Sequence, residues 1–250
     1  MKNFKRVLIG TALAGSLVVG AGYGTYSWFT AQTSATGTID NGTLALGDMG
    51  VNLFKQEKFA PSKTVESDLK TIDNTGSLNQ ILKATYNQKI TGPSGAALSA
   101  NQSSAVISKY KVYYLAIKYQ EKPKPEVVVD TRSNILKLIN ESTNGSLAQS
   151  VVTENPSYEV VQGELTAQEV QSLMSSKQTS PTEKTFILGN GDNDSFWTLT
   201  PKQHIDIQLF VKLANNAGNE FQGIHYDGTF KVEAKQTDTG AKFQSEINPN

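Results

Sequence analysis

The segment Ile205-Asp206-Ile207-Gln208-Leu209-Phe210-Val211-Lys212-Leu213 decides the fold class of this chain. Ile, Leu or Val occupies every second position, and most positions between them are polar. Successive side chains of a strand point to opposite faces of its sheet, so this alternation is typical of a strand with one buried face and one solvated face. The segment therefore predicts a sheet that packs one side against a core.

Similar patterns recur on both sides of this segment. Tyr110–Tyr119 is aromatic and β-branched, a composition that favours strands. Shorter strands are predicted at 43–46, 51–53, 65–72, 81–89, 186–188 and 230–234. Turn-forming residues such as Asp40-Asn41-Gly42 separate them. Strands at both ends of the chain predict an all-β fold, an antiparallel jelly-roll-like sandwich with short inserted helices.

Helical patterns occupy the middle of the chain. Asp130 or Thr131 can cap a helix with apolar residues at helical spacing, after a proline-containing connector at 121–125. Thr166-Ala167-Gln168-Glu169 has the pattern of a capping box and predicts a second helix. We expect a jelly-roll domain over residues 42–236, with a helical insertion around 130–178. The polar residues 237–250 are expected to form a flexible tail.

The N-terminus has the three parts of a secretory signal. Basic residues Lys2 to Arg6 precede an apolar run, and Thr25 and Ser27 are small residues at the spacing that a signal peptidase requires. This pattern predicts a signal peptide over residues 1–27 and a secreted protein that begins at Trp28. The alternative is an uncleaved membrane anchor, because the apolar run approaches the length that spans a bilayer.

Composition limits the function classes. The 250-residue chain is formally neutral, and removal of the basic signal leaves a slightly acidic protein, which does not favour nucleic acid as a partner. Cysteine is absent, which excludes disulfides, thiolate metal sites and cysteine nucleophiles. A chain of this size can bury enough surface to fold without such cross-links.

Four short motifs resemble the TasA/camelysin family of secreted Gram-positive proteins. In chain order they are Gly24-Thr25-Tyr26-Ser27-Trp28-Phe29, Gly42-Thr43-Leu44-Ala45-Leu46, Asn74-Thr75-Gly76-Ser77-Leu78, and Asn219-Glu220-Phe221-Gln222-Gly223 followed by 230–236. The resemblance implies a jelly roll that assembles through its N-terminal segment into fibres of the biofilm matrix. Some members are labelled metallopeptidases, so a secreted camelysin-like metalloendopeptidase is the alternative function.

Candidate metal ligands are few. His204 and His225 are the two histidines, and they could meet a carboxylate such as Asp206 or Asp227. No His-Glu-x-x-His motif is present, so polar residues at strand ends are the simpler interpretation. Asp192 and Asp194 offer oxygen ligands for calcium, but a solvated turn is the better explanation, because the loop lacks the internal Gly and the distant Glu of an EF-hand. We assign no catalytic residue and no cofactor from the sequence.

The last candidate site is an N-terminal arm over residues 28–41. Trp28 and Phe29 are apolar, yet they stand at the predicted mature terminus ahead of polar, turn-prone residues. We expect this arm to add as a donor strand to a sheet of the next copy, giving a homopolymer fibre. The alternatives are an arm that folds back onto its own domain and an arm without fixed structure. Other matrix or cell-surface proteins are further candidate partners, and contact with membrane is expected only through the signal.

Overall fold

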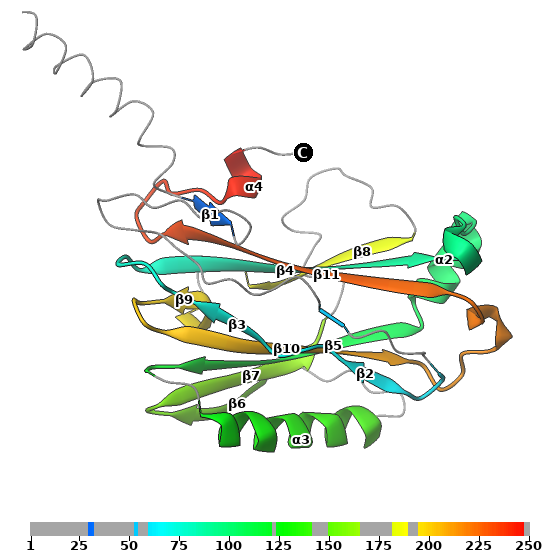
Figure 1. Cartoon of the computed structure of the whole chain (residues 1–250), viewed down its shortest axis with the longest axis horizontal. Coiled ribbons are helices and arrows are strands. Elements are labelled where there is room, and N and C mark those ends of the chain that lie inside the picture. Colours follow the sequence, from blue (N-terminus) through cyan, green and yellow to red (C-terminus); the bar gives the residue numbers. More distant parts are fainter. Residues whose placement is uncertain are drawn as a thin grey trace, which may run out of the picture.

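The computed structural model describes residues 30–32, 53–54, 60–121, 124–141, 150–165, 182–189 and 195–247. Two antiparallel sheets lie face to face, and a long helix covers the far side of one of them (Figure 1). The five-stranded sheet has the order β1 (Thr30–Gln32), β11 (His225–Gln236), β4 (Gln80–Thr91) and β8 (Glu183–Gly189), with β9 (Thr198–Leu199) also paired to β4.

The six-stranded sheet is built around β10 (His204–Leu213). Its order is β2 (Thr64–Glu66), β10, β5 (Tyr110–Tyr119), β7 (Tyr158–Glu164) and β6 (Ser150–Asn155), and β3 (Lys70–Asp73) pairs with β10 beside β2. The helices α2 (Ala100–Ile107), α3 (Pro125–Glu141) and α4 (Gln244–Ile247) and the turns η1 (Pro93–Gly95), η3 (Ser195–Trp197) and η4 (Asn219–Phe221) lie between or after strands.

The chain crosses repeatedly between the two sheets. β1 lies in the five-stranded sheet, β2 and β3 lie in the six-stranded sheet, and β4 returns to the five-stranded sheet. β5 to β7 lie in the six-stranded sheet, β8 in the five-stranded sheet, β10 in the six-stranded sheet and β11 in the five-stranded sheet. Within the five-stranded sheet the first strand pairs with the last. This is jelly-roll wiring, so the expected all-β antiparallel sandwich with inserted helices is confirmed.

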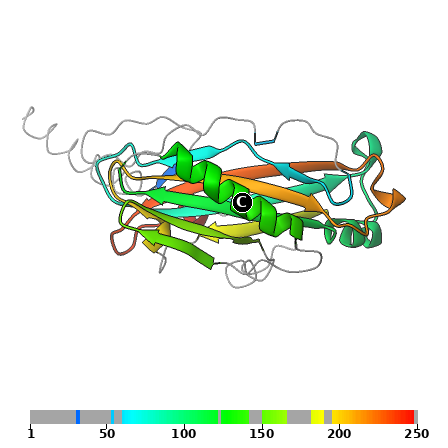
Figure 2. The same ribbon diagram turned by 90° about the horizontal axis from the view of Figure 1, so that it is seen from below.

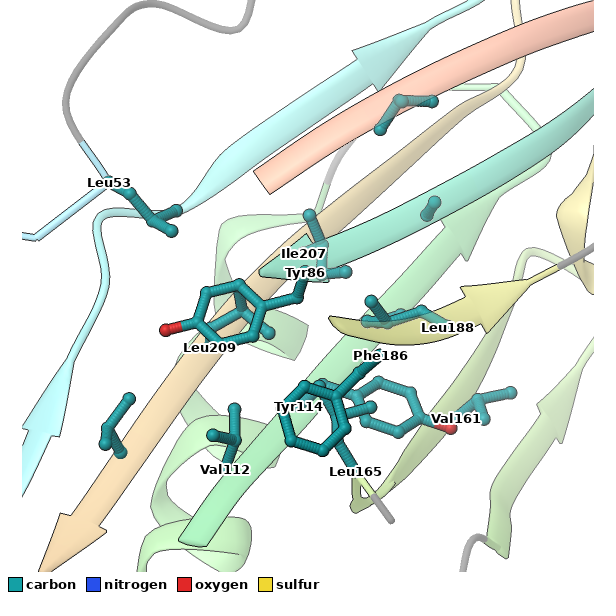
Figure 3. Packing of buried hydrophobic residues seen from close by; sticks show 14 of the residues in the cluster. Leu53, Tyr86, Val112, Tyr114, Val161, Leu165, Phe186, Leu188, Ile207 and Leu209 are labelled. Carbon is teal, nitrogen blue, oxygen red and sulfur yellow. The ribbon is translucent and has the colours of Figure 1, made fainter. Parts of the chain in front are cut away.

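The main core fills the space between the sheets (Figure 3). Tyr86 and Phe186 reach down from the five-stranded sheet, where their rings stack with centroids 6.3 Å apart. Val112, Tyr114 and Leu209 meet them from the six-stranded sheet. The alternation in the strands places these side chains on one face, and burial of that face is the largest favourable term in folding.

A second core lies between the six-stranded sheet and α3, which crosses the strands obliquely (Figure 2). Ile135 and Ile139 of α3 are fully buried there against residues such as Phe210 and Tyr113. The expectation that β10 is buried on one face only is therefore wrong, because every residue of this strand is buried. The alternation is real, but the helix covers the face that we expected to meet water.

Polar residues on that covered face find partners. Lys212 donates its Nζ proton to the carbonyl oxygen of Ile139 at 2.7 Å, near the C-terminal end of α3. Arg132 of α3 binds Glu66 of β2 at 2.6 Å, at the edge of the sheet. A cation near a helix C-terminus satisfies carbonyl groups that lack a helical partner. These contacts hold α3 in place at its middle and at its end.

The predicted strand over 65–72 is two strands. β2 pairs residue 66 with Phe210, whereas β3 pairs Ile72 with Ile205, so the register shifts by one residue between them. Buried Ser67 lies at the break, where its Oγ accepts the backbone proton of Leu209 at 2.9 Å. A side chain that replaces a ladder bond lets the strand accommodate one extra residue, as in a β-bulge.

Two expectations for the middle of the chain need correction. The first helix begins at Pro125, not at Asp130, because proline suits the first turn of a helix, where no N–H bond is lost. The Thr131 hydroxyl instead donates to a carbonyl one turn earlier, inside the helix. The expected helical insertion around 130–178 also holds β6 and β7, which extend the six-stranded sheet. The second predicted helix lies outside the described residues.

The C-terminal tail is also different from the expectation of a flexible segment over 237–250. Ala241 and Phe243 are buried, and α4 follows them. Apolar side chains that pack against a sheet do not behave as a free end. The last three residues, 248–250, lie outside the described part of the chain, as do the predicted signal peptide over residues 1–27 and the strand over 43–46.

Candidate functional site

The edge of the five-stranded sheet at β11 is the candidate functional site. On one side, β11 pairs with β4 along its whole length, from His225 opposite Thr91 to Gln236 opposite Gln80. On the other side its ladder with β1 covers three residues, with Thr30 opposite Lys235 and Gln32 opposite Glu233. β11 continues beyond this ladder for eight more residues, to His225.

The two faces of β11 differ in chemistry. Tyr226, Phe230, Val232 and Ala234 belong to the main core or pack against it. The odd-numbered residues between them face away from the core, and those from His225 to Lys231 are exposed. A strand that adds to this edge therefore meets an apolar side and a polar side in strict alternation.

Gly228 marks the closest approach between β11 and the core. A Cβ atom at this position would lie 2.3 Å from the hydroxyl of Tyr86 and 2.7 Å from the ring of Phe54. Glycine is needed here because any side chain would displace those two aromatic rings. The position lies in the part of β11 beyond the β1 ladder.

A cluster of tyrosines supports the same end of β11. The hydroxyls of Tyr86 and Tyr226 are 2.8 Å apart, and that of Tyr226 donates to Oε1 of Gln88 at 3.2 Å. The ring of Tyr110 lies against Tyr226 with centroids 5.0 Å apart. Burial raises the pKa of Tyr110 to about 12, and burial also raises the pKa of Tyr86 and of Tyr226. These phenols therefore stay neutral at physiological pH and serve as packing and hydrogen-bonding groups.

His204 is a buried polar residue beside the second core. It opens β10, and its imidazole lies against the ring of Tyr119 with centroids 5.3 Å apart. Asp206, two residues later on the same face, accepts a 2.6 Å hydrogen bond from Thr71. Burial raises the pKa of Asp206, while Thr71 and His204 act in the opposite direction and Asp73 adds to the rise. This group joins β3 to β10 at one end of the sandwich.

His225 lies at the opposite end and in the other sheet. His204 pairs with Tyr119, the last residue of β5, whereas Tyr226, next to His225, contacts Tyr110 at the start of β5. A strand of that length separates its ends by about 30 Å. The idea that the two histidines meet around a carboxylate is therefore wrong. Asp227 is exposed next to His225 and opposite Lys89.

Within the described ranges, no group of three or more His, Asp or Glu side chains is arranged to hold a metal ion. Asp192 and Asp194 lie outside those ranges. Trp28, Phe29, Thr25 and Ser27 do as well, so the described part of the predicted arm is β1 alone. None of the helices in the described residues has the length and apolar character needed to span a membrane.

The sequence predicted an N-terminal arm but not that its described residues, Thr30–Gln32, pair with β11. The strand over 230–234 was predicted too short, because Gly228 and the polar residues before it weaken the pattern over 225–229. The contribution of Phe243 was also missed, since it is an isolated aromatic residue in a polar tail. Comparisons of the chain with protein-family models, with curated proteins and with solved structures found no match.

Proposed function

We propose that this protein is a secreted structural protein that assembles into extracellular fibres, each copy donating its N-terminal arm to the five-stranded sheet of the next. The observation that carries the proposal is the ladder between β1, which belongs to the arm, and β11, the last strand of the sandwich. In the structure this ladder lies within one chain. An identical neighbouring copy can make the same ladder, as in domain swapping.

The length of the arm matches the length of the edge. Continued along the arm, the observed register brings Asp40 opposite His225, the first residue of β11. A donor strand over residues 30–40 thus covers β11 from Lys235 to its start. Main-chain hydrogen bonds along such a ladder give affinity that does not depend on a particular side chain.

The side-chain pattern of the arm fits the two faces of this edge. Directly opposed residues in an antiparallel pair project to the same side. In a donor strand that kept this register, the arm positions opposite inward-facing β11 residues would be Phe29, Ala31, Thr33, Ala35, Gly37 and Ile39, and those between them would be Thr30, Gln32, Ser34, Thr36, Thr38 and Asp40. The inward set is apolar or small, and the outward set is polar throughout. In the same register Gly37 would pair with Gly228, where β11 lies closest to the aromatic core.

An exchanged arm makes a head-to-tail contact. Donation and reception use different surfaces of one copy, so the contact does not close on itself and propagates as a filament. The export signal predicted over residues 1–27 and the resemblance to the TasA/camelysin family support the same function.

Paired charge substitutions test the proposal. Lysine at an inward position must bury a charge, so Ala35→Lys is expected to abolish fibres in electron micrographs. The matched control, Thr36→Lys, places the same charge on the polar side and should still assemble. Deletion of residues 28–40 should leave a folded monomer with a cooperative thermal transition. The proposal fails if the deleted protein still forms fibres as the intact protein does.

A further inference from the structure

We infer that the C-terminal segment Ala241–Ile247, here called the clasp, is a wall of the surface that receives an arm strand, and that it must be docked for the arm to stay bound. The inference rests on the proposed function, because it names a second part of the same acceptor site. α4, which ends the clasp, lies beside β1 (Figure 1).

The chain reverses direction after β11 to bring the clasp back over the sheet. The N–H of Ala241 donates to the carbonyl oxygen of Asp238 at 3.1 Å, and Gly240 has a φ of +94°. Such a φ suits glycine and lets the chain turn back sharply. The N–H of Phe243 then donates to Oε2 of Glu246 at 2.9 Å, which closes the first turn of α4.

Phe243 anchors the clasp on the outward face of the sheet. Its side chain is 1% exposed, although the face to which it binds is polar. The Nζ atom of Lys235 lies 4.7 Å from the ring centroid, and that of Lys83 lies 5.6 Å away. Two ammonium groups next to one ring are attracted to its π electrons.

A hydrogen-bonded network holds the clasp beside the anchor. The hydroxyl of Ser245 donates to Oε2 of Glu233 at 2.6 Å and accepts from Nζ of Lys83 at 3.0 Å. Lys231 also pairs with Glu233 at 2.9 Å. Burial alone would raise the pKa of Glu233, but the Ser245 hydrogen bond and the charges of Lys231 and Lys83 lower it overall. Glu233 therefore stays ionised in spite of its burial.

The clasp contacts those β11 residues that pair with the arm. Glu233 and Lys235 are the ladder partners of Gln32 and Thr30, and both are buried on the outward face. The outward residues of β11 outside the ladder, from His225 to Lys231, are exposed. The outward face of β11 is thus buried along the ladder with β1 and exposed beyond it. A ladder of three residues is too short to hold a strand by itself in water, so the packing of the clasp is what keeps β1 on β11.

Hydrogen exchange of the monomeric protein with its arm intact tests this role. In the variant Phe243→Ala, exchange of the amides of residues 30–32 should rise roughly tenfold or more relative to wild type, because the arm strand opens locally. Amides of β10 should not change. The matched control is Lys242→Ala, which alters the exposed neighbour of Phe243 and should exchange as wild type does. Ser245→Ala, a milder change, should shift exchange in the same direction.

Equal exchange of residues 30–32 in wild type, Phe243→Ala and Ser245→Ala would overturn the inference. Its failure is distinct from failure of the proposed function. If wild type forms no fibres but Phe243→Ala still loosens the arm, the clasp stands and donor-strand assembly is wrong. If fibres form and the arm is equally protected in all variants, assembly stands and the clasp has no such role.

Discussion

At the scale of single residues, Asn74 shows how one buried amide joins two distant turns. Its Nδ2 donates to the carbonyl oxygens of Leu78 at 2.9 Å and Leu199 at 3.1 Å. Its Oδ1 accepts from the N–H of Gly76 at 3.0 Å and from Nε2 of Gln80 at 2.7 Å. The segment that follows β3 is thereby fixed to β9. The sequence indicates a polar turn at this point, but the contact with Leu199, 125 residues away, depends on the tertiary fold.

We predict that Asn74→Ala lowers the free energy of unfolding by about 2–4 kcal/mol, because it leaves several buried polar groups without this partner. Asn79→Ala is the matched control, since Asn79 is exposed and close in sequence. Urea denaturation of the two variants measures the difference. A loss below about 1 kcal/mol for Asn74→Ala would show that the amide is not the link that we describe.

Asp206 gives a prediction for pH dependence. Burial raises its pKa above the ordinary value of 3.8, so the ionised form is disfavoured in the folded protein. Its contribution to stability is greatest below pH 3.8 and is lost as pH rises through the folded pKa. Asp206→Asn keeps an acceptor for Thr71 and removes the charge. The variant should be more stable than wild type at pH 7, with the gain vanishing in acid; a gain that grows as pH falls would contradict this sign.

At the scale of elements, α3 explains where sequence reasoning about β10 succeeded and where it failed. The alternation of Ile205 to Leu213 correctly indicated a strand and assigned its two faces. It could not indicate that a helix, joined to the sheet through β5, covers the polar face. The sequence pattern predicts that Lys212 faces solvent, but this residue is 5% exposed and its ammonium group donates a hydrogen bond to α3. A long side chain with one charged end fits both a solvent-exposed face and a face covered by a helix, so the pattern does not distinguish these two environments.

We predict that α3 contributes to stability through the second core. Ile135→Ala should lower the free energy of unfolding by about 2–5 kcal/mol, because this side chain is fully buried beneath the helix. Leu138→Ala on the same helix is the matched control, since Leu138 is 40% exposed and should cost clearly less. Thermal denaturation of both variants measures the contrast. Equal losses would mean that the helix does not cover a core.

At the scale of the whole molecule, the sandwich could be predicted because strands appear at both ends of the chain. The order of the strands could not, since each ladder joins segments far apart in sequence and many pairings bury the same faces. The pairing of Thr30–Gln32 with β11 spans nearly the whole described chain. The clasp was missed for a related reason: Phe243 has no apolar neighbours in sequence that would predict its burial.

If the arm strand of one copy occupies the β11 edge of another, mixed cross-linking of two preparations will join their chains. The chain has no cysteine, so single substitutions give unambiguous disulfides. Ala31 and Ala234 are ladder partners, and a disulfide fits the separation of such partners. One preparation carries Ala31→Cys and the other Ala234→Cys. Ala84→Cys replaces the second as a control, because Ala84 is equally buried but lies on β4.

Equal mixing of the first two preparations under assembling and oxidising conditions should give a disulfide between positions 31 and 234, joining two chains in the fibre. The mixture with Ala84→Cys should give none. A double variant, Ala31→Cys with Ala234→Cys, reports the same pairing within one chain. Donor-strand exchange is contradicted if fibres form while the mixed chains stay unlinked and the double variant cross-links only within itself.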